Sequence, residues 1–326
     1  MQEVDPNKVD LDAMQMQDTQ VLLKAARDNY GNVTTKSIPL NAKRKPVFVD
    51  RFLDPMNLVN HFYTPRRTGA FLILSGPSLK DVNLDTVADC GALTMGVNNS
   101  WSVFTPDIWT CVDPPEKFLY SGWMNPQIMK FIPHKLKNKT LRWKAGPEDW
   151  VPTSMKAGDA PNTFMYHRNA HFNHRTYLTE SSVNWGQAAK KPCSLGISSC
   201  RSVMLAAIKI LFLLGIRNIY LLGCDFNMSR SKGYAFDQHR SRNSVKGNNR
   251  TYHALTKRFE AMKGHFDDNG LTVYNCNPNS ALEVFPYKEL EDVVHYESEY
   301  RKKDFDTLGW YEKEPKSGGS KVKKNG

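Results

Sequence analysis

The most apolar part of this chain, residues 203–223, constrains its fold more than any other feature. A helix that spans a bilayer needs about 20 residues with few or no charges, whereas this stretch contains Lys209 and Arg217. The apolar period of residues 199–214 instead predicts a buried helix that ends at a glycine, and residues 218–222 predict a buried strand. A helix that leads directly into a buried strand is half of a βαβ unit, and such units require a parallel sheet.

Further apolar runs repeat this alternation along the chain. The predicted strands are residues 70–74, 93–97, 108–112, 140–143 and 271–274, and residues 254–268 form a second predicted helix. Alternating strands and helices favour an α/β protein with a Rossmann-like, mostly parallel sheet flanked by helices.

The length of the chain allows one large α/β domain with additional segments. We expect an N-terminal extension over residues 1–66, a Rossmann-like domain over 67–295, and a C-terminal extension with a disordered basic tail over 296–326. Within the domain, residues 118–195 have four tryptophans and few aliphatic runs, so we predict an inserted region over the sheet. Residues 225–252 are polar and basic, which predicts a lid loop.

Charge and cysteine content narrow the class of partner and the compartment. The formal net charge of +11 predicts an anionic partner, such as a nucleotide, an anionic glycan, a nucleic acid or a membrane surface. The first residues are acidic where a signal peptide needs a basic start and an apolar core, so export is not indicated. The six cysteines form no CxxC pair, which favours reduced thiols in a cytoplasmic protein. The sequence allows a homo-oligomer.

Polar turns follow several of the predicted strands. The turn SGPSLK at residues 75–80 contains Gly76, which permits close approach of a ligand, and Ser78, which can cap the next turn. Asn98 and Asp113 follow the next two strands, where their side chains can bind ribose hydroxyls or a base edge. The competing interpretation is that all of these residues are ordinary turn formers.

Two further features are candidates for chemistry. Ser198 and Ser199 open the predicted helix 199–214, where hydroxyl groups and the helix dipole favour an anion, although serines also serve as plain N-caps. His253 lies between the polar loop and the helix 254–268, where a neutral imidazole can act as a general base.

A histidine run and a basic run each have a functional and a structural interpretation. His167, His171 and His174 can place two metal ligands on one helical face, but a polar surface segment is favoured because no matching acid or cysteine stands out. The basic residues 230–250 indicate either nucleic-acid binding or a lid over donor phosphates, and the scarcity of stacking aromatics favours the lid.

The ordered set of motifs resembles the bacterial sialyltransferases of glycosyltransferase family 42, within a wider Rossmann-like group that includes pterin diphosphokinases. The matching pieces, in the family's order, are GPSLK at 76–80, Asn98, residues 219–226, YAFD at 234–237, His253 with its following helix, and residues 273–280, which end in PNS. They span about residues 70–290 of the chain.

The resemblance implies a GT-A-type variant of the Rossmann-like fold that transfers sialic acid from a CMP-activated donor with inversion and without a metal. It implies that His253 deprotonates the acceptor hydroxyl and that Tyr234 hydrogen-bonds the departing phosphate. The candidate residues for binding the donor nucleotide are Ser75, Gly76, Ser78, Asn98, Asp113, Ser198, Ser199, Asp225 and Asn227. An inverting displacement needs one base and a stabilised leaving group, and no DxD motif follows a suitable strand.

Four positions depart from the family pattern. Leu74 stands at a loop glycine, Asn227 at the second lid tyrosine, Gly196 at an arginine and Asp113 at an asparagine. These changes alter the hydrogen bonding and charge expected around the nucleotide, so a sugar nucleotide other than CMP-sialic acid also fits the pattern.

The sequence therefore predicts an inverting, metal-independent glycosyltransferase that uses a nucleotide-sugar as substrate and needs no further cofactor. The predicted acceptor is an anionic glycan or a nucleic acid. One alternative is a diphosphokinase-like phosphotransferase, which would need Mg²⁺ and ATP. A second alternative is a basic nucleic-acid-binding protein on a degenerate transferase fold, which would bind with steep salt dependence.

Overall fold

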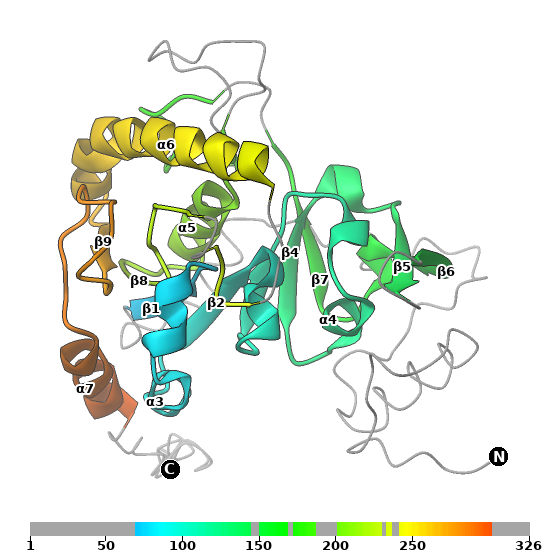
Figure 1. The fold of residues 1–326 in the computed structure, drawn as a ribbon, viewed down its shortest axis with the longest axis horizontal. Helices are drawn as coiled ribbons and strands as arrows, with labels where there is room; N and C mark the ends of the chain where they lie inside the picture. Colours follow the sequence, from blue (N-terminus) through cyan, green and yellow to red (C-terminus); the bar gives the residue numbers. More distant parts are fainter. Residues whose placement is uncertain are drawn as a thin grey trace, which may run out of the picture.

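Seven parallel strands form the main sheet of the protein (Figure 1). The computed structural model describes residues 69–144, 150–168, 172–186, 201–229, 233–236 and 241–301. The strands are β1 (Gly69–Ile73), β2 (Leu93–Val97), β3 (Ile108–Thr110), β4 (Met129–Pro133), β7 (Thr163–Tyr166), β8 (Asn218–Leu222) and β9 (Thr272–Asn275). Their order across the sheet is β7-β4-β3-β2-β1-β8-β9, and every neighbouring pair is parallel. This confirms the predicted Rossmann-like α/β fold.

Both faces of the sheet are covered. In β1, Ala70 and Leu72 pack into the hydrophobic core on one face, while Phe71 and Ile73 pack into the core on the other. Successive side chains of a strand point to opposite faces, so a strand buried on both sides has a continuous apolar sequence. This is why the central strands were recognisable as uninterrupted apolar runs.

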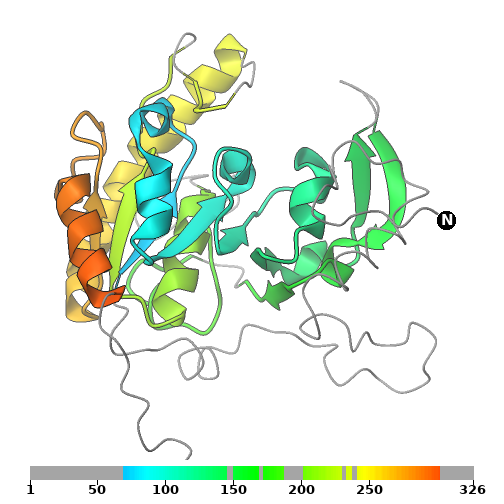
Figure 2. The ribbon, with the colours of Figure 1, turned by 90° about the horizontal axis from the view of Figure 1, so that it is seen from below.

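Helices lie on both sides of the sheet, as the two views in Figures 1 and 2 show. Residues of α5 (Val203–Leu213) and α6 (Arg242–Asp268) belong to the core on one face, and residues of α3 (Leu84–Asp89) and α7 (Leu290–Arg301) belong to the core on the other. None of the helices in the described part of the chain has the length and apolarity that a membrane crossing requires. Shorter elements complete the fold: α4 (Tyr120–Met124) and the 3₁₀ turns η4 (Pro77–Asp81), η5 (Asn98–Ser102), η6 (Pro115–Lys117), η7 (His134–Leu136) and η8 (Ala157–Asp159).

Helix α5 confirms the helix–strand unit expected from the most apolar stretch. It begins at Val203 rather than at residue 199, and the side chain of Ser202 caps it by accepting from the Met204 amide at 3.2 Å. It ends before Gly215, which has a φ of 90°. Lys209 is fully buried in this helix, and its ammonium group donates to the carbonyl oxygens of residues 178 and 180.

The sequence predicted that residues 118–195 form an insertion over the sheet, and the structure corrects this prediction. They contribute β4 and β7 to the sheet itself, and only β5 (Thr140–Lys144) and β6 (Trp150–Lys156) form a separate antiparallel hairpin, which lies beyond the β4–β7 side of the sheet in Figure 1. Strand β4 escaped recognition because Lys130 interrupts its apolar pattern. The ammonium group of Lys130 is buried and donates to three carbonyl oxygens, those of Asn125, Ile128 and Pro161.

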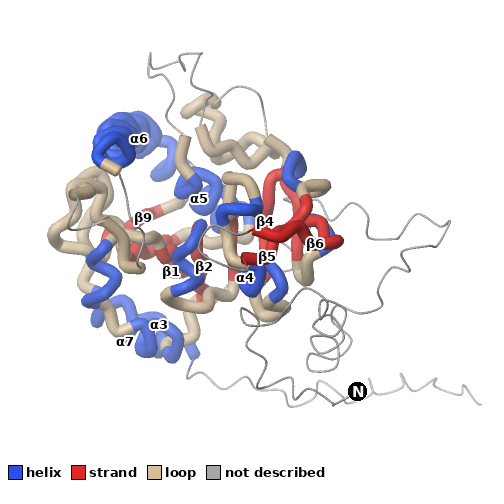
Figure 3. The backbone as a smooth tube through the Cα atoms, turned by 45° about the vertical axis from the view of Figure 1, so that its right-hand side comes forward, coloured by secondary structure: helices blue, strands red, loops and turns tan. Residues whose placement is uncertain are grey.

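The predicted lid loop over residues 225–252 is also partly wrong. Its last 11 residues are helical, because α6 begins at Arg242 and not at residue 254. The Ser241 side chain caps the helix by accepting from the Ser244 amide at 3.2 Å. The first turns of α6 are polar and show no apolar period, so periodicity alone detected only the second half of this long helix. Figure 3 shows α6 nearly end-on, on the side of the molecule opposite α3 and α7.

Candidate functional site

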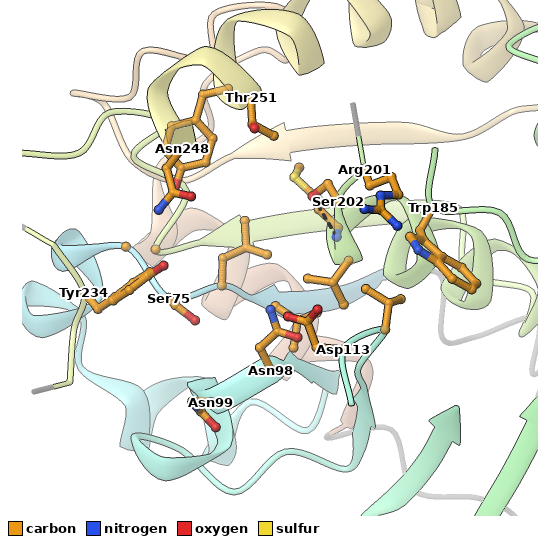
Figure 4. A pocket seen from close by; sticks show the side chains of 18 of the residues that line it. Ser75, Asn98, Asn99, Asp113, Trp185, Arg201, Ser202, Tyr234, Asn248 and Thr251 are labelled. Carbon is orange, nitrogen blue, oxygen red and sulfur yellow. Dashed lines mark hydrogen bonds between the residues drawn. The ribbon is translucent and has the colours of Figure 1, made fainter. Parts of the chain in front are cut away.

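A pocket of about 980 Å³ lies at the carboxyl edge of the sheet (Figure 4). Segments 74–76, 97–99, 112–114 and 223–227 line it, and they follow β1, β2, β3 and β8 respectively. The chain proceeds from β1 outward through β2, β3, β4 and β7 and then returns to place β8 on the other side of β1. The pocket thus opens where the strand order reverses, which is the usual position of ligand sites in open parallel sheets.

The turn after β1 and the loop after β8 are joined at the floor of this pocket. The Gly76 amide donates to the Gly223 carbonyl at 2.9 Å. The Ser78 hydroxyl donates to Oδ2 of Asp225 at 2.8 Å, and the amide group of Asn277 approaches Oδ1 of the same carboxylate at 3.4 Å. Ser78 does not line the pocket; it positions Asp225, which does. A Cβ atom on Gly76 would lie 1.9 Å from Asp225 Oδ2, so only glycine fits there.

Asn98 lines the pocket in a left-handed backbone conformation. Its φ is 51°, a region that asparagine adopts more readily than most other non-glycine residues. Its carbonyl oxygen accepts from Trp109 Nε1 at 2.6 Å, which holds the residue in place. The side-chain Oδ1 is buried and has no hydrogen-bond partner among the described residues. Buried polar atoms are nearly always paired, so a ligand is the natural partner for this oxygen.

The loop after β8 contains a strained residue, Phe226. Phe226 has a φ of 52°, and its ring stacks on Tyr252 of α6 with centroids 5.0 Å apart. A bulky side chain in the left-handed region costs about 1–3 kcal/mol, and such strain tends to cluster at functional sites. Both Phe226 and Tyr252 line the pocket.

Asp113 and the lid residue Tyr234 also reach the pocket, as the sequence predicted. Asp113 forms a half-exposed ion pair with Lys117 at 3.4 Å. Tyr234 stacks on Phe236 with nearly parallel rings, and its hydroxyl group points into the pocket toward the turn after β1 in Figure 4. The amide of Ala235 donates to the carbonyl of residue 75 at 3.1 Å, which ties this part of the lid to β1.

His253 is not at the pocket, and this corrects the sequence-based assignment. The pocket face of α6 consists of Asn248, Thr251, Tyr252 and Leu255, which recur at the spacing of one helical face. His253 lies in the middle of the helix, is exposed and does not line the pocket. The sequence placed His253 before the helix. Because α6 begins at Arg242, 12 residues before the predicted start at residue 254, the helical register sets the orientation of His253.

The remaining predicted residues differ in where the structure places them. Ser75 and Asn227 line the pocket. Ser198 and Ser199 lie outside the described residues, as does His171. His167 and His174 do not share a helical face, since β7 ends at residue 166 and both follow it in irregular structure. The described part of the chain contains no group of three or more His, Cys, Asp or Glu side chains arranged to hold a metal.

Several pocket residues were not predicted from the sequence. Lys135, Trp185 and Arg201 line one end of the pocket, and Asn248 and Thr251 line it from α6. The spacing of Asn248, Thr251 and Tyr252 is a helical signal in polar residues, which an apolar search ignores. Trp185 and Lys135 had no local signal, because the sheet order alone brings their segments to the pocket.

Comparison of the chain with protein-family models, with curated proteins and with solved structures finds no match. The resemblance to sialyltransferases therefore stays a prediction from motifs.

Proposed function

We propose that this protein transfers a sugar from a nucleotide-sugar donor to an acceptor hydroxyl. The observation that supports this most is the pocket at the point where the strand order reverses, with Gly76, Asn98 and Tyr234 converging from three separate segments. A nucleotide needs close backbone approach, acceptors for its ribose hydroxyls and a donor to its phosphate, and this set supplies all three.

The donor is proposed to lie across the ends of β1 and β2. The backbone at Ser75 and Gly76 permits close contact, and the buried Oδ1 of Asn98 accepts from a ribose hydroxyl. The Tyr234 hydroxyl donates to the phosphate as the sugar leaves. This bond strengthens in the transition state because negative charge develops on that oxygen.

A carboxylate is proposed as the base in place of His253. Three carboxylates line the pocket: Asp113, Glu116 and Asp225. Asp225 already accepts hydrogen bonds from both the hydroxyl and the amide of Ser78, and Glu116 is exposed. Asp113 has one ion pair, with Lys117, which is half-exposed to solvent. Asp113 follows β3 directly and lies beside the proposed donor, so it is the residue we assign.

The reaction then has one displacement. Asp113 takes the proton of the acceptor hydroxyl while the oxygen forms a bond to the anomeric carbon. The bond from that carbon to the phosphate oxygen breaks, and the electron pair leaves with the nucleotide. Removal of a general base lowers such rates by about 10²–10⁴-fold.

The first experiment screens CMP, UDP, GDP and ATP by thermal shift, each with and without Mg²⁺. A ligand that binds only the native state raises the melting temperature, so a shift with a pyrimidine or guanine nucleotide is expected. Loss of this shift in Asn98→Ala would place the nucleotide in the pocket. No shift with any nucleotide would contradict the proposal.

The second experiment measures nucleotide release from the sugar donor of whichever nucleotide binds. Asp113→Asn should lower the rate about 10²–10⁴-fold with near-normal nucleotide binding. His253→Ala is the matched control, because this exposed side chain lies on α6 outside the pocket. If His253→Ala lost activity and Asp113→Asn retained it, the assignment of the base would be wrong.

The alternatives predict different outcomes in the same screen. A phosphotransferase would respond to ATP with Mg²⁺ and to none of the other nucleotides. A nucleic-acid-binding protein would show no nucleotide shift and would bind DNA or RNA with an affinity that falls steeply with salt.

A further inference from the structure

Three cations gather at the end of the pocket away from Tyr234. Lys135 follows β4, Arg168 follows β7, and Arg201 precedes α5. Lys135 and Arg201 line the pocket together with Trp185, and Figure 4 shows Arg201 and Trp185 across the pocket from Tyr234. Neighbouring strands are about 4.8 Å apart. Since β4 is separated from β1 by β3 and β2, the end of β4, which Lys135 follows, lies roughly 14 Å from the end of β1.

The buried indole ring of Trp185 orients two of these cations. Cζ of Arg168 lies 4.1 Å from the ring centroid, and Nζ of Lys135 lies 5.1 Å from it. Arg168 also donates from Nε to Oδ1 of Asn184 at 3.2 Å and from Nη2 to the carbonyl of Gly186. Both acceptors are neutral, so these contacts hold the guanidinium group in place without cancelling its charge.

The positive charges act on one another. Burial, followed by the charges of Arg168 and Arg201, lowers the pKa of Lys135, while Asp113 raises it. Burial and then Arg201 lower the pKa of Arg168. Asp113 is already paired with Lys117, and within the described ranges none of the three cations forms a salt bridge to a carboxylate. An added anion would relieve this repulsion.

We propose that Lys135 and Arg201, with the positive charge of Arg168 beside them, bind a phosphate group of the acceptor. The only carboxylate beside these three cations in the described ranges, Asp113, is already paired with Lys117. The remaining positive charge therefore suits a ligand with two negative charges better than a ligand with one.

The guanidinium group of Arg201 can bind phosphate through two parallel hydrogen bonds, and Lys135 adds a point charge. Arg168, whose Nε and Nη2 already donate to protein oxygens, adds its positive charge from behind them. That this anion belongs to the acceptor rests on the proposed function. The anion site itself does not rest on it, because the donor phosphate is expected at the opposite end of the pocket, near Tyr234.

The test titrates inorganic phosphate into the full chain by calorimetry at constant ionic strength, because salt screens exposed charges. Lys135→Met and Arg201→Gln replace exposed side chains and should fold normally. Each is expected to weaken phosphate binding by about tenfold, the typical effect of losing one charge-assisted bond. Lys139→Met is the matched control, since Lys139 is exposed nearby but does not line the pocket.

Separate results overturn separate parts of this proposal. Equal phosphate affinity in Lys135→Met, Arg201→Gln and the Lys139→Met control would show that the cluster is not the site. Acetate binding as tightly as phosphate would contradict the dianion assignment. CMP binding should be unchanged in the Lys139→Met control. If no nucleotide binds the parent protein while phosphate binding depends on the cluster, the proposed function fails and the anion site stands.

Discussion

Replacing Gly76 with alanine tests the junction on which the pocket is built. The added Cβ would lie 1.9 Å from Oδ2 of Asp225 and 2.5 Å from the carbonyl oxygen of Gly223. Side-chain contacts can relax by rotation, but the Gly223 oxygen is backbone and already accepts from the Gly76 amide at 2.9 Å. The loop after β8 must therefore move away from the turn after β1.

The expected cost has two parts. Overpacking of a tight site costs about 1–3 kcal/mol. Displacing Asp225 also weakens the bonds it accepts from Ser78, and a hydrogen bond to a charged group contributes about 1.5–3 kcal/mol. Together these give a loss of about 2.5–6 kcal/mol, which corresponds to a fall in melting temperature of roughly 5–24 °C for a domain of this size.

The assay is urea unfolding and thermal denaturation of Gly76→Ala beside the matched variant Gly264→Ala. Gly264 lies in α6 with no atom within 4 Å of an added Cβ, so the same substitution there should stabilise the helix by up to about 1 kcal/mol. A melting temperature of Gly76→Ala within about 2 °C of the parent would refute the steric argument, because it corresponds to less than roughly 1 kcal/mol.

Three further predictions concern buried groups and a helix cap. Lys130→Met should lower the free energy of unfolding by about 1–3 kcal/mol in urea titrations, because it leaves buried carbonyl oxygens unpaired. Burial lowers the pKa of Lys130 to about 7, whereas the unfolded chain has a value of about 10.4. Between these two pH values the unfolded state binds more protons, so Lys130 makes the free energy of unfolding rise with pH. Lys130→Met should lose this part of the pH dependence. Ser202→Ala should cost about 1 kcal/mol by removing the cap of α5, whereas an unchanged midpoint would show that another group caps the helix. Burial raises the pKa of the Cys111 and Cys224 thiols, so a thiol reagent should modify both only after unfolding, and rapid labelling of the native protein, mapped by mass spectrometry, would contradict their burial.

The amino-acid sequence by itself determined the parts that depend on local pattern. Continuous apolar runs indicated β1, β2 and β8, because strands buried on both faces need no polar alternation. The glycine after α5 and the polar turns after the strands indicated where elements end, and the parallel fold then implied that those turns share one edge. Ser75, Gly76, Asn98 and Asp113 were found in this way and do line one pocket.

Only the tertiary structure decided what depends on neighbours and on register. The position of β4 and β7 in the sheet places Lys135 and Arg168 beside Trp185, although no sequence pattern links these residues. The start of α6 at Arg242 turns Tyr252 toward the pocket and His253 toward solvent, since successive residues of a helix are rotated by about 100°. Local sequence sets which elements form, whereas the packing of those elements against one another sets which side chains meet.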